Sequence, residues 1–68
     1  MLVKVNSEKL KSVRTSMGLS MTKLSELSGL SGNAVFRMET KPMKVSDLRL
    51  KEVAKILLID VNELIRKE

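Results

Sequence analysis

Residues 20–38, with the sequence SMTKLSELSGLSGNAVFRM, contain the features that decide the fold: two short helices and the turn between them. Ser20 can cap the first helix, because its hydroxyl oxygen can accept a hydrogen bond from a free backbone N–H group. Leu24 and Leu27 line the inner side of this helix. Ser28-Gly29 ends it, since glycine adopts the positive φ of a tight turn without steric cost.

The second helix of this stretch follows directly. Ser31 can cap it, Val35 and Met38 face inward, and Leu30 is an apolar turn residue that we expect to be buried. Two helices joined by a tight, glycine-containing turn are the general form of a helix-turn-helix. An ordinary αα-hairpin has the same local pattern, so the stretch by itself leaves both interpretations open.

Further helices are predicted on both sides of residues 20–38. Asn6 or Ser7 can cap a helix that Gly18 ends, and its inner side consists of Leu10, Val13 and Met17. Ser46-Asp47 opens another helix, with the aspartate near the positive end of the helix dipole. The inward stripe of that helix is Leu50, Val53, Ala54 and Leu57. The weak alternation at the start of the chain predicts that residues 1–6 form an N-terminal arm or an edge strand.

The last predicted helix is short. Asp60 and Glu63 have the spacing of a capping box, and Leu64 and Ile65 face inward. The helix that starts at Ser31 ends near Glu39-Thr40, because Pro42 disfavours helical geometry just before it. The expected fold is therefore all-α, with five short helices in a single domain over residues 1–68.

Composition excludes several classes of protein. The chain has no cysteine and no histidine, so a disulfide is impossible and a metal site is not expected. No phosphate-binding loop and no acid–base pair is present, so we expect no cofactor and no enzyme activity. The net charge of +5 suits a nucleic acid or an anionic membrane. We expect no membrane binding, since the lysines are spread over several helices and the longest apolar run, Ile56 to Ile59, is short.

A set of residues from Leu10 to Leu64 resembles, without a gap, the phage repressor and Cro family, also called the XRE-type helix-turn-helix family. The matching residues are Leu10, Arg14, Gly18-Leu19-Ser20, Leu24, Gly29-Leu30-Ser31, Val35, Glu39, Leu50, Ala54, Leu57 and Leu64. The resemblance implies a compact, lambda-repressor-like domain of five helices, in which the second and third form the helix-turn-helix. It also implies that the third helix lies in the major groove of DNA.

The resemblance assigns roles to individual residues. Arg14 and Glu39 form a structural ion pair that fastens the third helix to the first. Base edges are contacted from the third helix, where asparagine suits adenine and arginine suits guanine; the candidates are Asn33, Arg37, Gly32 and Phe36. Phosphates are contacted from helix N-termini and nearby lysines; the candidates are Ser20, Met21, Thr22, Lys23, Ser31, Lys41, Lys44 and Ser46.

Phe36 allows three interpretations. It can pack on a thymine methyl group, meet a protein partner, or belong to the core. The chain also departs from the family pattern at several positions. A glutamine, a glycine, a proline and a second glycine are usual where this chain has Met21, Lys41, Val45 and Leu58.

Two functions follow from these observations. The first is a phage-like, Cro-like transcription regulator, a repressor that binds operator DNA as a homodimer and is cytoplasmic and nucleoid-associated. At this length we expect no separate dimerisation domain, so dimer contacts come from residues 58–65 or from the N-terminal arm. The alternative is a protein-interaction module on the same fold, antitoxin-like or repressor-modulating. Salt distinguishes the two, since binding that neutralises phosphates weakens steeply as salt rises.

Overall fold

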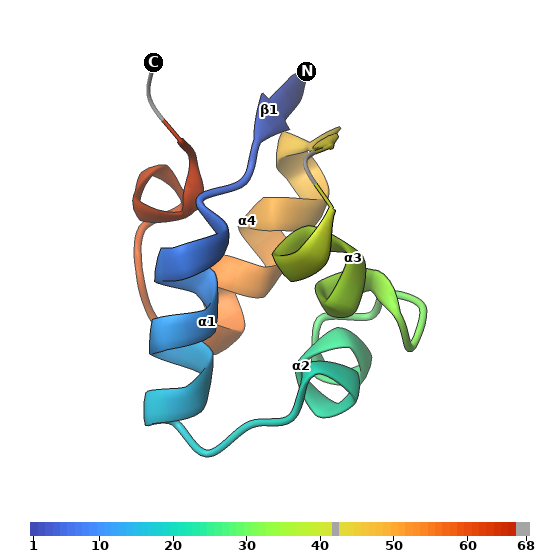
Figure 1. Ribbon diagram of the computed structural model, residues 1–68, viewed down its shortest axis with the longest axis vertical. Helices are drawn as coiled ribbons and strands as arrows, with labels where there is room; N and C mark the ends of the chain where they lie inside the picture. Colours follow the sequence, from blue (N-terminus) through green and yellow to red (C-terminus); the bar gives the residue numbers. More distant parts are fainter. Residues whose placement is uncertain (42, 67–68) are drawn as a thin grey trace.

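The computed structural model describes residues 1–41 and 43–66, in which the helices pack together and a short two-stranded sheet lies at one end of the molecule (Figure 1). The α-helices are α1 (Ser7–Ser16), α2 (Met21–Leu27), α3 (Ala34–Thr40) and α4 (Asp47–Leu57), followed by the 3-10 helix η1 (Val61–Leu64). The strands are β1 (Leu2–Lys4) and β2 (Lys44–Ser46). In these residues no helix has the length and apolar character needed to span a membrane.

The helical helix-turn-helix arrangement is confirmed, whereas the description as five helices without strands is wrong in two respects. β1 and β2 pair antiparallel, with Val3 opposite Val45, so of the two predictions for the start of the chain the strand is confirmed for residues 2–4 and the free arm is wrong. The fifth expected helix is a single 3-10 turn, because the backbone becomes extended at Ile65, which forms a bridge with Val5. β1 therefore lies between β2 and residues 65–66.

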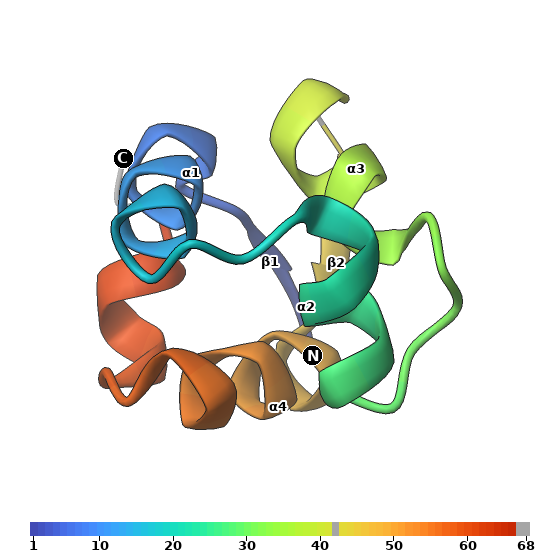
Figure 2. The same cartoon turned by 90° about the horizontal axis from the view of Figure 1, so that it is seen from below.

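The hydrophobic core fills the space between the helices, with α1 and α3 on the side opposite α4 (Figure 2). Its members are Val5, Leu10, Leu24, Val35, Met38, Leu50, Val53, Ala54, Leu57 and Leu64. All of these except Val5 were predicted to face inward. Val13, Leu30 and Ile65 are only partly buried against this core.

Two predicted inward residues, Met17 and Leu27, are exposed. Met17 already lies past the last helical residue of α1. The buried side of α2 contains Leu24, Ser25 and Ser28, so the helix is rotated away from Leu27. Small polar residues therefore occupy buried positions of α2 that the hydrophobic pattern did not mark.

Helix starts agree with the predicted caps except at α3. The side chains of Asn6, Ser20, Ser46 and Asp60 each accept a backbone N–H bond at the start of α1, α2, α4 and η1. Ser31 was predicted to cap the next helix, but its hydroxyl donates to Asn33 Oδ1 (3.2 Å) and α3 begins three residues later. The helix ends at Thr40, as predicted, and so continues two residues past Met38, the last residue assigned to the helix-turn-helix. Pro42, the predicted helix breaker, lies outside the described residues.

Glu63 was predicted to complete a capping box with Asp60. Its carboxylate instead lies 3.5 Å from Lys9 Nζ on α1. Asp60 caps the turn by itself through a 2.8 Å bond from the Asn62 N–H group.

Three of the four α-helices end in the same motif, with a left-handed residue directly after the last turn. These residues are Gly18 (φ +70°), Gly29 (φ +74°) and Leu58 (φ +59°). In each case the next residue donates its backbone N–H group to the carbonyl five positions earlier, as from Ile59 to Ala54 (3.1 Å). Leu58 thus occupies a backbone position that costs a non-glycine residue energy.

Replacing Leu58 with glycine should stabilise the protein by about 0.5–1 kcal/mol, as relief of the left-handed strain outweighs the added freedom of the unfolded chain. Little burial is lost, because Leu58 is 84% exposed. Urea denaturation measures the change in the free energy of unfolding. The protein concentration is kept in the range where the urea midpoint does not depend on it, so that association does not contribute.

Gly18→Ala is the matched variant, and it should change the free energy of unfolding in the opposite direction. A Cβ atom there would meet no atom within 4 Å, so the expected loss of about 1 kcal/mol comes from the backbone alone. A Leu58→Gly protein no more stable than the parent would contradict the assignment of strain to this position.

Candidate nucleic-acid interface

α3 has a buried side and an exposed side. Val35 and Met38 are buried in the core, whereas Phe36 and Arg37 point to solvent and Asn33 is exposed just before the first turn. Phe36 is 46% exposed, so its assignment to the core is wrong and the two outward interpretations remain. The predicted base-contacting side chains therefore share one accessible surface.

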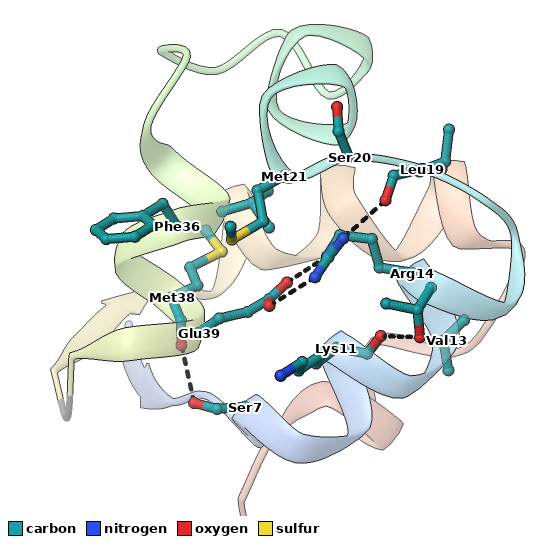
Figure 3. Close-up of polar contacts among 12 residues, drawn as sticks. Ser7, Lys11, Val13, Arg14, Leu19, Ser20, Met21, Phe36, Met38 and Glu39 are labelled. Carbon is teal, nitrogen blue, oxygen red and sulfur yellow. Dashed lines mark hydrogen bonds and ion pairs between the residues drawn. The ribbon is translucent and has the colours of Figure 1, made fainter.

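The C-terminal end of α3 is fastened to α1 by a buried ion pair (Figure 3). Arg14 Nε donates to Glu39 Oε2 (2.6 Å), and Arg14 Nη2 donates to Glu39 Oε1 (3.0 Å). The third guanidinium nitrogen, Nη1, donates to the carbonyl of Leu19 (2.7 Å), which lies just before α2. One arginine thus joins α1, the start of α2 and the end of α3. Nearby, the Ser7 hydroxyl donates to the carbonyl of Met38 (2.8 Å).

The N-terminal end of α3 is held by Ser25 of α2, which the sequence analysis missed. Ser25 Oγ accepts the backbone N–H of Val35 (3.0 Å) and donates to the carbonyl of Met21 (2.8 Å). Val35 is in the first turn of α3, where no intrahelical partner exists for that N–H group. Helical spacing from Met21 marks positions 24, 25 and 28 as one side, and this signal could have identified Ser25.

A hollow beside α3 brings together two exposed apolar side chains and two cations. Phe36 and Arg37 line it from α3, Asn33 lines it from just before that helix, and Lys41 and Met43 line it from beyond its C-terminal end. Of the predicted phosphate contacts, Lys41 therefore lies next to the predicted base contacts. Gly32 is exposed, and nothing occupies the space where a Cβ atom would stand.

A second groove runs from the α2–α3 turn to α4 and carries three cations. Arg37, Lys44 and Arg49 line it together with Ser31 and Ser46, and no acidic side chain is among the described residues that do so. Arg49 was not among the predicted site residues. Its position on the chain gives no hint of a role, because Arg49 lies on α4, twelve residues after Arg37, and only the tertiary structure places both on one groove.

The remaining predicted phosphate contacts form a separate group at the start of α2. Ser20, Thr22 and Lys23 are exposed there, while Met21 is half-buried against the core. Ser20 Oγ accepts the N–H of Lys23 (3.0 Å), which fixes the first turn of α2. Within the described residues, no three aspartates or glutamates gather where a metal ion could be held.

Ser25→Ala should destabilise the protein by about 1–3 kcal/mol, because the buried N–H group of Val35 loses its acceptor. Ser28→Ala is the matched control: this hydroxyl is also buried, and it has no hydrogen-bond partner among the described residues. Its removal should be neutral or stabilising. Urea denaturation compares the two, and equal losses would contradict the role assigned to Ser25.

Arg14→Met should cost about 3–5 kcal/mol, because it leaves the carboxylate of Glu39 buried without a partner. The double variant Arg14→Met, Glu39→Leu should recover part of this loss, since no buried charge remains. Circular dichroism during thermal and urea unfolding measures the stability of both variants.

The exposed Lys55–Glu52 pair (3.4 Å) is the control, and Lys55→Met should cost less than about 1 kcal/mol. A double variant as unstable as the sum of its single variants would show that the two residues act independently.

Comparison with known proteins agrees with this geometry. Residues 10–64 match a family model described as helix-turn-helix, HTH_3. The restriction-modification controller protein C.AhdI from Aeromonas hydrophila is similar in structure, with 34% identity, coverage of 87% of this chain and 89% of that one, and a TM-score of 0.78.

A second similar structure is that of SinR, the master regulator for biofilm formation, in complex with DNA. Its identity to this chain is 25%, the coverage is 82% of this chain and 90% of that one, and the TM-score is 0.68. A search of curated protein sequences found no match. The family match spans most of the chain, including the buried Arg14–Glu39 pair and both helices of the motif. The chain therefore belongs to the XRE-type helix-turn-helix family of DNA-binding transcriptional regulators.

Proposed function

We propose that this protein is a Cro-like repressor that binds operator DNA as a homodimer, with α3 of each subunit in the major groove. The observation that carries the proposal is the two-sided design of α3: its inner side is fastened at both ends, and its outer side presents Asn33, Phe36 and Arg37. The structure of SinR in complex with DNA supports a nucleic-acid partner. The family and both relatives are regulators, and we assign no catalytic activity to this chain.

Base contacts are assigned to Asn33 and Arg37. Arginine presents two parallel donors that match the O6 and N7 acceptors of guanine, and asparagine matches adenine in the same groove. Asn33 and Arg37 lie one helical turn apart, and the Arg37 N–H donates to the carbonyl of Asn33 (3.1 Å). Gly32 adds no side chain, which allows the backbone to approach the bases closely.

Phosphate contacts are assigned chiefly to the groove that contains Lys44 and Arg49. Both side chains are exposed and lie on the same groove as Arg37, so a DNA backbone beside the occupied major groove passes within their reach. Ser31 and Ser46 line the same groove, and Lys41 lines the hollow that Arg37 also borders. A second group lies at the start of α2. Its residues are predicted to contact the phosphates on the other side of the DNA major groove; they are Ser20, Met21, Thr22 and Lys23.

The size of the protein supports a homodimer on DNA. The longest dimension of the protein is 29 Å, whereas successive major-groove half-sites lie about 34 Å apart on one face of the duplex. One molecule therefore covers one half-site. Leu58, together with Ile59, Val61 and Ile65, is the proposed dimer surface, because residues 2–4 are already engaged in the sheet. An operator-bound repressor acts on the nucleoid, so we place the protein in the cytoplasm.

A protein partner is the second candidate, and exposed apolar side chains away from α3 favour it. Leu48 at the start of α4 is 68% exposed, and Leu58 is more exposed still. Apolar association does not depend on counterion release, so its affinity should change little with salt.

The first experiment is a fluorescence anisotropy titration of the protein with the duplex upstream of its own gene, and with a shuffled duplex, at low and moderate salt. Binding should be selective for the natural duplex and should weaken as salt rises. Arg37→Ala should weaken it by about 5- to 150-fold, the range for a lost bidentate base contact.

Two further variants test the phosphate contacts. The double variant Lys44→Ala, Arg49→Ala should lower the slope of log affinity against log salt by about 2, since each phosphate contact contributes about 1. Lys55→Ala also removes a positive charge, but from the far end of α4, and it should leave the slope nearly unchanged. Binding that is indifferent to sequence, salt and Arg37 would reject the repressor and favour the protein partner.

A further inference from the structure

The outer side of α3 presents an aromatic ring where helices that face water carry polar side chains. Phe36 is 46% exposed, and Met43, from the segment after α3, is 43% exposed and lines the same hollow. The ring of Phe36 points away from the Arg14–Glu39 pair and from α1 (Figure 3). The two apolar side chains therefore contribute little to the core, and their hydration is unfavourable until something covers them.

The surroundings of this hollow indicate the chemistry of what covers it. Arg37 and Lys41 line it beside the two apolar side chains, and Asn33 adds an amide. An apolar ligand without charge would leave the two cations unused. A polyanion that also carries a small apolar group satisfies all five residues at once.

DNA carries such a group in its major groove. The C5 methyl of thymine is the only apolar feature that a natural base pair presents there, and phenylalanine is among the side chains that contact it. Phe36 lies on the same surface as the proposed base contacts Asn33 and Arg37, so it meets the bases when α3 enters the groove. The cations then face the phosphates that border the same base pairs.

Asn33 limits where in the DNA half-site the thymine is expected. Residues three apart on a helix have Cβ atoms about 5–6 Å from one another, and successive base pairs rise by about 3.4 Å. Asn33 and Phe36 therefore face base pairs at most about two steps apart. The Oδ1 atom of Asn33 already accepts a hydrogen bond from Ser31, which holds the amide in place, and its second lone pair remains for the N6 donor of adenine.

We propose that Phe36 and Met43 form an apolar contact for the thymine methyl group, so that each half-site contains an obligatory thymine within two base pairs of the adenine bound by Asn33. This inference rests on the proposed binding of operator DNA, and it adds a methyl-dependent element to its specificity. Phe36 is then a specificity-determining residue, and Met43 supports it from the segment that follows α3.

The test uses the natural duplex of the titration above, with each thymine of a half-site replaced in turn by deoxyuridine. Deoxyuridine lacks only the methyl group and keeps the O4 acceptor and the base pairing. At one or two positions in each half-site the wild-type protein should bind the uracil duplex about four-fold more weakly, the factor that burial of one methyl group supplies.

Variants connect the methyl group to Phe36. Phe36→Ala should bind the thymine duplex more weakly, and its affinities for the thymine and uracil duplexes at that position should be equal. Met43→Ala should reduce the thymine-to-uracil ratio without abolishing it. Met17→Ala is the matched control, since Met17 at the end of α1 is also 43% exposed and should leave the ratio unchanged.

The outcomes separate this inference from the function on which it rests. Selective binding of the duplex without loss at any uracil position would overturn the methyl contact and leave the operator-binding function intact. A uracil effect that persists in Phe36→Ala would overturn the assignment to Phe36. Absence of selective binding by the wild-type protein would overturn both proposals. The wild-type comparison needs no variant, so it holds even if Phe36→Ala is unstable.

Discussion

The buried ion pair between Arg14 and Glu39 is the interaction on which the position of α3 depends. Its two hydrogen bonds, 2.6 and 3.0 Å long, fix the guanidinium plane, and the third nitrogen of Arg14 then reaches the carbonyl of Leu19. Burial of two opposite charges adds little net stability, but it penalises every arrangement in which they are apart. The pair therefore selects one orientation of α3 against α1 more than it strengthens the fold.

This selection is needed because α3 has only seven residues, too few to be stable as a helix in isolation. Ser25 supplies the missing acceptor at its N-terminal end, and Ser7 and Arg14 hold its C-terminal end. With the inner side so constrained, the outer side is free to vary in composition without loss of the fold. An exposed phenylalanine is tolerated there for the same reason, and its presence points to a use on binding.

The small sheet ties β2, the strand that comes after α3, to the N-terminal residues. β1 pairs with β2, and the backbone N–H of Arg66 donates to the carbonyl of Lys4 (2.9 Å) on the other side of β1. Through β1, β2 is therefore linked to both ends of the described chain. Lys44 begins β2 and Arg49 lies in the first turns of α4, so their places on the groove beside Arg37 depend on this pairing.

The sequence determined the helices, most of the core and, through the family resemblance, the Arg14–Glu39 pair, because caps and helical periodicity are local properties that neighbouring residues report. Helical spacing marks Ser25 as an inward residue, but only the tertiary structure decided its bond to the Val35 N–H group. The pairing of the strands, the outward direction of Phe36 and the place of Arg49 were also decided there. Strands of three residues have almost no local signal, and Val3 meets a partner 42 positions away at Val45. A phenylalanine at a helix surface is compatible with either side until the neighbouring helices pack. Strand pairing and the direction of such side chains therefore depend on contacts between residues far apart in the sequence.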